Sequence, residues 1–290
     1  MAIVNTNIGA SVAQQALVRN ERAMSAAMEQ LSTGKKINSA ADDAAGLAIS
    51  SRMTAQIRGL DQAVRNANDG ISMVNTAEGA MIEVTAMLQR MREITVQSAN
   101  GTTDSADRSY LNKEYQALAT EIQRVATNTQ WNGRDILTGD AASTGNSAVS
   151  FQVGANGGQT ISVTIGDISS TGNTTFAALQ SSGASGSIAT TTAASAQTVA
   201  TSTLTAIDAA IKDISEKRAD LGAGSNQLTH AVDNLTSIKI NAEESRSRIL
   251  DTDYAQSTSE LARTQIIQQA GTAMLAQANQ LPQTVLALLQ

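Results

Sequence analysis

Few side chains in this sequence are of the types that carry out chemistry. The 290 residues include no cysteine and one histidine, His230, so there is no thiolate nucleophile and no histidine pair for a metal or for acid–base catalysis. Asp251 and Asp253 could coordinate a cation, but a capping or turn role at a segment boundary accounts for them more simply. The glycine-rich stretch 154–158 is not followed by the Lys-Ser/Thr pair of a phosphate-binding loop. We therefore expect no catalytic residue, no metal and no cofactor.

The composition indicates closely packed helices and excludes several classes of partner. Hydrophobic residues make up 41% of the chain, aromatic residues only 2%, and Pro282 is the single proline, which favours helices. The net charge of −6 and the pI of 4.9 argue against nucleic acid, which requires a basic surface. No run of about 18 apolar residues suggests a membrane span. No apolar segment follows the first basic residue, Arg19, so an ordinary secretory signal is not expected.

Two blocks of the chain have the 3.5-residue period of packed helices. The first runs from about 43 to 98, which predicts a rod of roughly 80 Å, and a second helix follows it from about 104 to 128. The period returns from Leu204 to Ile238. In the first block the apolar positions are Met53, Ile57, Leu60, Val64, Ala67, Ile71, Val74, Met81, Val84, Leu88 and Met91.

The middle of the chain changes period. Apolar residues alternate with small polar residues around Phe151 and again around Val163, which predicts a β-hairpin near 147–166 with a glycine-rich loop. Residues 168–203 are mostly Ser, Thr, Ala and Gly. We expect this tract to bury little surface and to be loosely structured, and residues 170–198 within it to be dispensable for polymerisation.

Both ends of the chain lack charge and repeat every seven residues. Residues 1–18 and 264–290 carry no charged side chain, whereas a coiled coil exposed to water normally has charged flanks. We therefore expect burial between copies of the chain; a two-helix stalk closed on itself is the alternative. The predicted subunit-interface residues are Ile3, Ala10, Leu17, Met24 and Leu31 at the N-terminus, and Ile267, Met274, Leu281 and Leu288 at the C-terminus.

A series of short motifs resembles bacterial flagellin, the filament subunit of the flagellum. The resemblance covers about residues 1–140 and 200–290, whereas the middle resembles no particular member. The motifs are QLSTGKKIN at 30–38, DDAAGLAI at 42–49, IRGL at 57–60, NDGIS at 68–72, TAEGA at 76–80, TQWNG at 129–133, AEESRSRI at 242–249 and DYA at 253–255.

The resemblance implies a mainly α fold of long antiparallel helices in a coiled-coil-like rod, with one β-hairpin and a small irregular variable region. It also implies a protein that is exported unfolded through a dedicated apparatus and polymerises into the extracellular filament used for swimming. Expected partners are other flagellin subunits, an export chaperone, the filament cap and hook-associated proteins. The implied segments are an N-terminal inner-core helix at 1–43, the N-terminal part of the outer rod at 44–180, a variable region at 168–203, the C-terminal helix of the outer rod at 204–248 and a C-terminal inner-core helix at 249–290.

The same resemblance suggests a site for a host receptor, Toll-like receptor 5. The corresponding positions are Gln89, Arg90, Glu93 and Ile94, with Glu114 on the next helix; the sequence departs from the best-known stimulatory pattern, which has Val, Leu and Ala at Met91, Ile94 and Thr95. The alternative interpretation is an ordinary charged face beside the Met-Leu core stripe. Met91 belongs to that stripe, so it should support the helix, and Thr95 should add a hydroxyl at the flank of the patch.

Two other functions are weighed against the filament subunit. A hook–filament junction protein shares the terminal helices but lacks this density of flagellin motifs. A zinc peptidase, which some flagellins carry in the middle of the chain, requires a His-Glu-x-x-His helix, and the middle contains no histidine.

Overall fold

The computed structural model describes residues 7–139, 148–180, 187–189 and 192–287. The chain divides into two compact units, one made of Met1–Ile57 with Ile240–Gln290 and the other of Arg58–Lys239. The architecture is mainly α with long helices and two small antiparallel β-pairs, so the predicted fold class is confirmed.

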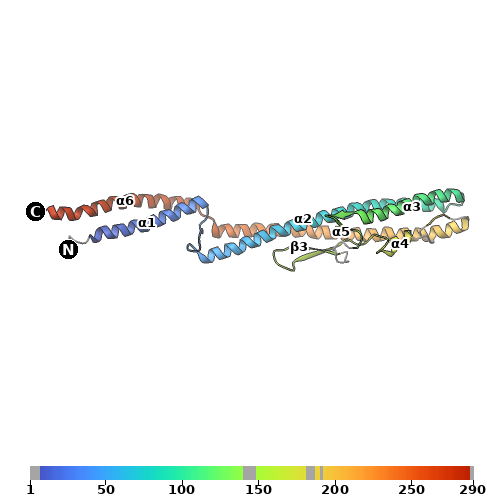
Figure 1. Ribbon diagram of the computed structural model, residues 1–290, viewed down its shortest axis with the longest axis horizontal. Helices are drawn as coiled ribbons and strands as arrows, with labels where there is room; N and C mark the ends of the chain where they lie inside the picture. Colours follow the sequence, from blue (N-terminus) through green and yellow to red (C-terminus); the bar gives the residue numbers. More distant parts are fainter. Residues whose placement is uncertain (1–6, 140–147, 181–186, 190–191, 288–290) are drawn as a thin grey trace. The chain divides into compact units, whose positions relative to one another are not determined.

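The first unit contains the two terminal helices, α1 (Ile8–Thr33) and α6 (Tyr254–Ala287), which run antiparallel side by side (Figure 1). The Asn7 carboxamide oxygen caps α1 by accepting from the Ala10 amide at 3.0 Å, and Gly34 ends this helix in the left-handed conformation with φ of 69°. The Asp253 carboxylate accepts from the Ala255 amide at 2.9 Å. Asp253 therefore has the capping role expected from the sequence.

Helices α2 (Ala44–Ser98) and α5 (Ala193–Leu250) are the long elements, and α3 (Ser105–Asn128) lies beside them in the second unit. The boundaries of α2 agree with the heptad prediction. The helix begins after Asp43 because the Asp43 carboxylate accepts from the Ala45 and Gly46 amides at 3.0 and 2.9 Å and so caps it. The α5 helix begins earlier than Leu204, where large periodic residues start.

Two antiparallel β-pairs belong to the second unit. The predicted hairpin consists of β3 (Ala148–Gln152) and β4 (Thr160–Thr164), with Phe151 opposite Ile161; the predicted start at 147 lies outside the described residues. The other pair, β1 (Gln130–Trp131) with β2 (Arg134–Asp135), was not predicted. Its turn residues have φ of 51° and 76°, which is the conformation that Asn-Gly turns adopt in two-residue hairpins.

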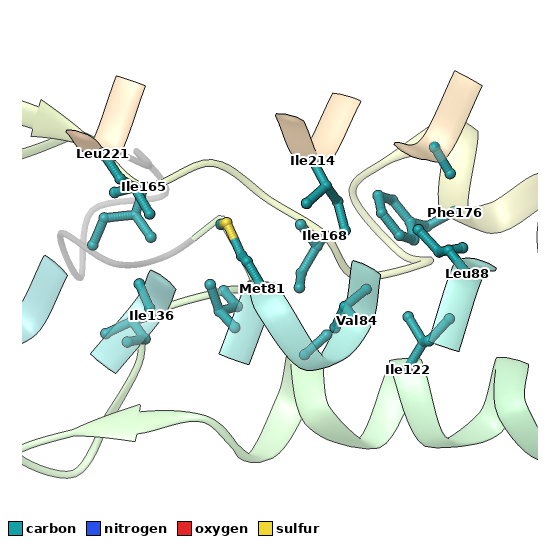
Figure 2. Packing of buried hydrophobic residues seen from close by; sticks show 14 of the residues in the cluster. Met81, Val84, Leu88, Ile122, Ile136, Ile165, Ile168, Phe176, Ile214 and Leu221 are labelled. Carbon is teal, nitrogen blue, oxygen red and sulfur yellow. The ribbon is translucent and has the colours of Figure 1, made fainter. Parts of the chain in front are cut away.

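The main hydrophobic core of the second unit lies between α2, α3, α5 and the segments that follow the hairpins (Figure 2), and a smaller cluster is formed by Leu60, Ala63 and Leu235. Large side chains from all of these elements are buried there, and the heptad positions of α2 supply one side of the core. The residues labelled in Figure 2 are Met81, Val84, Leu88, Ile122, Ile136, Ile165, Ile168, Phe176, Ile214 and Leu221.

The expectation that residues 168–203 bury little surface is wrong for the described part of this tract. Phe176 and Leu179 lie on the short helix α4 (Thr174–Gln180) and are each 2% exposed, and Ile188 is buried as well. The tract has few large apolar residues, but Phe176, Leu179 and Ile188 among them point into the core. Alanines can also pack closely against neighbouring helices, which lets α5 begin at Ala193. The reason for expecting residues 170–198 to be dispensable, that few contacts depend on them, therefore fails, whereas their role in polymerisation stays a prediction.

Candidate functional site

The described residues contain no cluster of potential metal ligands, since no group of three or more of their His, Asp or Glu side chains is placed to hold a metal ion. His230 is exposed on α5. None of the helices in the described part of the chain combines the length and apolarity needed to cross a bilayer.

The small and apolar residues of α6 repeat every seven residues in two sets, one containing Gly271 and the other containing Ile267 and Met274. Only the set that contains Gly271 packs against α1. A Cβ added at Gly271 would lie 2.5 Å from Leu17 Cδ2, so Leu17 packs directly onto this glycine. The predicted interface residues Ala10, Leu17, Met24 and Leu31 of α1 are half-buried, whereas Ile267 and Met274 of α6 are 42% and 65% exposed. Ile3 and Leu288 lie outside the described residues, and Leu281 lies in α6 with no described side-chain environment.

Large apolar side chains stay exposed on both terminal helices. We call this set the terminal apolar surface: Ile8, Val12, Val18 and Met28 on α1, and Ile266, Ile267 and Met274 on α6. Such a concentration of exposed apolar residues marks an interaction surface in a soluble protein. The same part of α6 carries no charge from residue 264 onward, so no repulsion opposes close approach of another uncharged helix.

A backbone clasp joins the segments that connect to the terminal helices. The Lys36 amide donates to the Leu250 carbonyl at 2.7 Å, and the Thr252 amide donates to the Gly34 carbonyl at 3.1 Å. Asp251 contributes to this clasp as the β-bridge partner of the residue that precedes Lys36, so its role is structural.

The turn between α1 and α2 is organised by one carboxylate. Asp42 Oδ2 accepts from the backbone amides of Asn38 and Ser39 at 3.1 and 2.8 Å, and from the Ser39 hydroxyl at 3.1 Å. The bond from the Ser39 amide, followed by that from Asn38, lowers the pKa of the Asp42 carboxyl because these donors favour its charged form.

The sequence-predicted receptor patch is a charged network on the exposed face of α2. The Arg90 guanidinium contacts Glu114 Oε1 at 2.8 Å and Glu93 Oε2 at 3.0 Å. Hydrogen bonds to Glu114 and then to Glu93 raise the pKa of Arg90 above its ordinary value. Gln89 is also exposed and, with Glu93, helps to line a surface depression on α2. The structure thus brings these four residues together.

Ile94 does not belong to this patch. It is 0% exposed, and Thr95 is equally buried with its hydroxyl donating to the Met91 carbonyl at 2.7 Å. The physical reason is the helical period, since Met91, Ile94 and Thr95 continue the core-facing stripe of Leu88. The predicted receptor contact at Ile94 and the hydroxyl on the patch flank are therefore wrong, whereas Met91 lies in the core as expected.

Asn20 is a functional candidate that sequence reasoning missed. It is 8% exposed and lies between α1 and α6. Its position could have been found from the heptad pattern, because it stands seven residues from Ala13 and seven from Ala27, both of which are seam positions. A polar residue at such a position is uncommon and often fixes how helices align.

Paired terminal helices with exposed apolar residues in the first unit, and long packed helices in the second, are features of a self-assembling structural protein. The N-terminal helical region of bacterial flagellin matches residues 4–142, and the C-terminal helical region of bacterial flagellin matches residues 204–289. The chain belongs to the bacterial flagellin family. It is a structural subunit of the flagellar filament, which places it in the extracellular flagellum, and the hook–filament junction alternative is not favoured.

Individual proteins agree with this assignment over the whole chain. A flagellin from Halalkalibacterium halodurans is 45% identical over 288 residues, covering 99% of this chain and all of the relative. Flagellin A of Vibrio cholerae is 37% identical and covers 99% of both chains. A putative flagellar hook-associated protein from Vibrio parahaemolyticus, at 17% identity, shares the fold over 72% of this chain and all of its own length with a TM-score of 0.57.

Proposed function

We propose that this chain polymerises by burying its terminal apolar surface against other copies, so that the terminal helices form an inner core. The observation that carries the proposal is the exposure of large apolar residues on helices whose outer ends, up to residue 18 and from residue 264 onward, carry no charged side chain, with Met274 as the most exposed member on the C-terminal half of α6. In this scheme residues 1–43 and 249–290 are the inner core, and 44–180 with 204–248 are the outer rod.

The energetic argument is additive over many subunits. Full burial of a Val, Ile or Met side chain is worth roughly 1.5–3 kcal/mol, and seven such side chains form the terminal apolar surface. Association also costs several kcal/mol in lost translational and side-chain freedom. Several of these residues must therefore be buried together to favour a polymer.

Met274→Asp tests this proposal. The change introduces a charge at a position that should be desolvated in the polymer, so we expect the concentration required for polymerisation to rise at least tenfold. Ser259→Asp is the matched control, because Ser259 is exposed on the same helix among residues that are already charged. Equal polymerisation of the two variants, measured by sedimentation, would remove Met274 from the subunit interface.

We further propose that the chain is secreted unfolded and meets an export chaperone, the filament cap and hook-associated proteins on its way to the filament. The lack of cysteine removes disulfide formation as an obstacle to threading and refolding. The chain has no enzymatic role in this proposal. Accumulation of the protein in the medium of a motile host, and its loss when flagellar export is blocked, would test the route.

A second proposal concerns host recognition of the unassembled subunit. Arg90, Glu93 and Glu114 form one exposed charged network, with Gln89 exposed beside it, and by family resemblance this surface binds Toll-like receptor 5. Arg90 has the planar donor fork typical of binding hot spots. The same face would contact the next subunit along the filament, so polymer and receptor would compete for it.

Arg90→Ala should weaken binding of the monomer to the receptor ectodomain by about 2 kcal/mol, or roughly thirtyfold. Arg124→Ala is the control, because Arg124 is an exposed arginine paired with a glutamate on α3 and lies outside the patch. If both variants bind as well as the unmodified chain, the patch is not the receptor site.

A further inference from the structure

The seam between α1 and α6 contains a buried polar contact. Asn20 Nδ2 donates to the Thr264 carbonyl at 2.8 Å and to Gln268 Oε1 at 3.1 Å. Asn20 is 8% exposed and Thr264 is 2% exposed. Nearer the chain ends, Asn7 Nδ2 donates to the Ala278 carbonyl at 2.8 Å. Both asparagines therefore reach across from α1 to α6 in the same antiparallel alignment.

The apolar part of the seam distinguishes poorly between alignments. Leu17 packs onto Gly271, but the residue seven positions further along α6 is Ala278, which is also small. A shift of one heptad, about 10.5 Å, would thus place Leu17 against another small residue. Charged flanks, which set the alignment of many helix pairs, are absent from α6 beyond residue 263.

The backbone clasp at the end of the α1–α6 pair does not decide between these alignments either. Its two hydrogen bonds join the Lys36 and Thr252 amides to the Leu250 and Gly34 carbonyls, and backbone amides and carbonyls recur at every residue of a chain. By contrast, a shift of one heptad in either direction would replace Gln268 with a leucine, Leu261 or Leu275. The buried Asn20 amide would then lose its side-chain partner.

We propose that Asn20, through its hydrogen bond to the Gln268 side chain, selects the register in which α1 and α6 pair. In either shifted register the Asn20 amide would still meet a backbone carbonyl but would face a leucine side chain, and the loss of its side-chain partner disfavours that register, as a single buried asparagine does in coiled coils. This role rests on the proposed inner core formed by these helices, and it concerns which alignment the pair adopts rather than whether the helices associate.

Engineered disulfides can measure the register because the chain has no cysteine of its own. A Cβ at Gly271 would lie 3.2 Å from Leu17 Cγ, so the double change L17C/G271C reports the native register. The pair L17C/A278C reports a shift of one heptad, since its cysteines are about 10.5 Å apart along the native helices and cannot bond. Disulfides within one chain keep the monomer mass on a non-reducing gel, whereas disulfides between copies give dimers.

The measurement is made on the full chain, free and as filaments, with and without Asn20→Leu. We expect Asn20→Leu and Gln268→Leu each to raise the shifted disulfide at least fivefold, while Gln14→Leu, an exposed change on α1, leaves it unchanged. An unchanged shifted disulfide in Asn20→Leu would overturn the proposal. Loss of both disulfides would also overturn it, because Asn20 would then be needed for pairing itself. Failure of the unmodified chain to polymerise would instead refute the proposed function.

Discussion

Phe176→Ala measures how much the tract at 168–203 contributes to the stability of the second unit. A buried phenylalanine removes roughly 150–250 Å² from water, which corresponds to about 4–6 kcal/mol at 25 cal/mol per Å². Phe176 is 2% exposed within the main core, so nearly all of this applies. The area estimate is an upper bound, and measured Phe→Ala changes in cores cost about 3–5 kcal/mol. We expect a loss of that size.

The assay is urea and thermal unfolding of the purified monomer, followed by helical circular dichroism. A loss of 3–5 kcal/mol corresponds to a Tm lowered by about 6–20 °C for a unit of this length. Thr174→Ala, an exposed change on the same short helix, should stay within about 0.5 kcal/mol of the unmodified chain. A loss below about 1 kcal/mol for Phe176→Ala would refute the reasoning that this tract is part of the core.

Two other perturbations test the helix packing and the inter-helix turn. Gly79→Ala should stabilise the monomer by about 0.5–1 kcal/mol because nothing lies within 4 Å of the added Cβ. Gly70→Val should destabilise it by about 1–3 kcal/mol because Phe151 leaves no space for the larger side chain. Equal unfolding midpoints for the two variants would contradict this. The Ser39 amide lowers the pKa of the Asp42 carboxyl. The hydrogen bonds that the Asp42 carboxylate accepts should therefore be present above about pH 4, and they should be lost as the pH falls through the pKa that this carboxyl has in the folded chain. Asp42→Asn should therefore increase amide exchange at Ser39 near neutral pH and leave it little changed in strong acid.

The long helices could be predicted because their cores repeat with the helical period. The stripe from Met53 to Met91 follows from backbone geometry, and it is buried or half-buried throughout. The same period would have placed Ile94 in the core, three residues beyond Met91. Motif resemblance places Ile94 on the receptor patch, whereas the helical period places it in the core, and the structure agrees with the period.

The start of α5 and the packing of α4 could not be predicted in the same way. Residues 193–203 contain alanines and short polar residues, which bury their small side chains only where neighbouring helices approach closely. Phe176 and Leu179 are three residues apart, but the next large apolar residue, Ile188, lies nine residues further on, so no repeat is established. Their burial depends on long-range contacts, and local sequence patterns do not encode these.

Electron microscopy of the purified protein tests most directly whether this chain assembles through its terminal helices. The full chain should form long hollow filaments under polymerising conditions, and a chain truncated after Gln269, which lacks Met274 and the last turns of α6, should remain a soluble monomer. Normal filaments from the truncated chain, or the absence of any filament from the full chain, would contradict the claim.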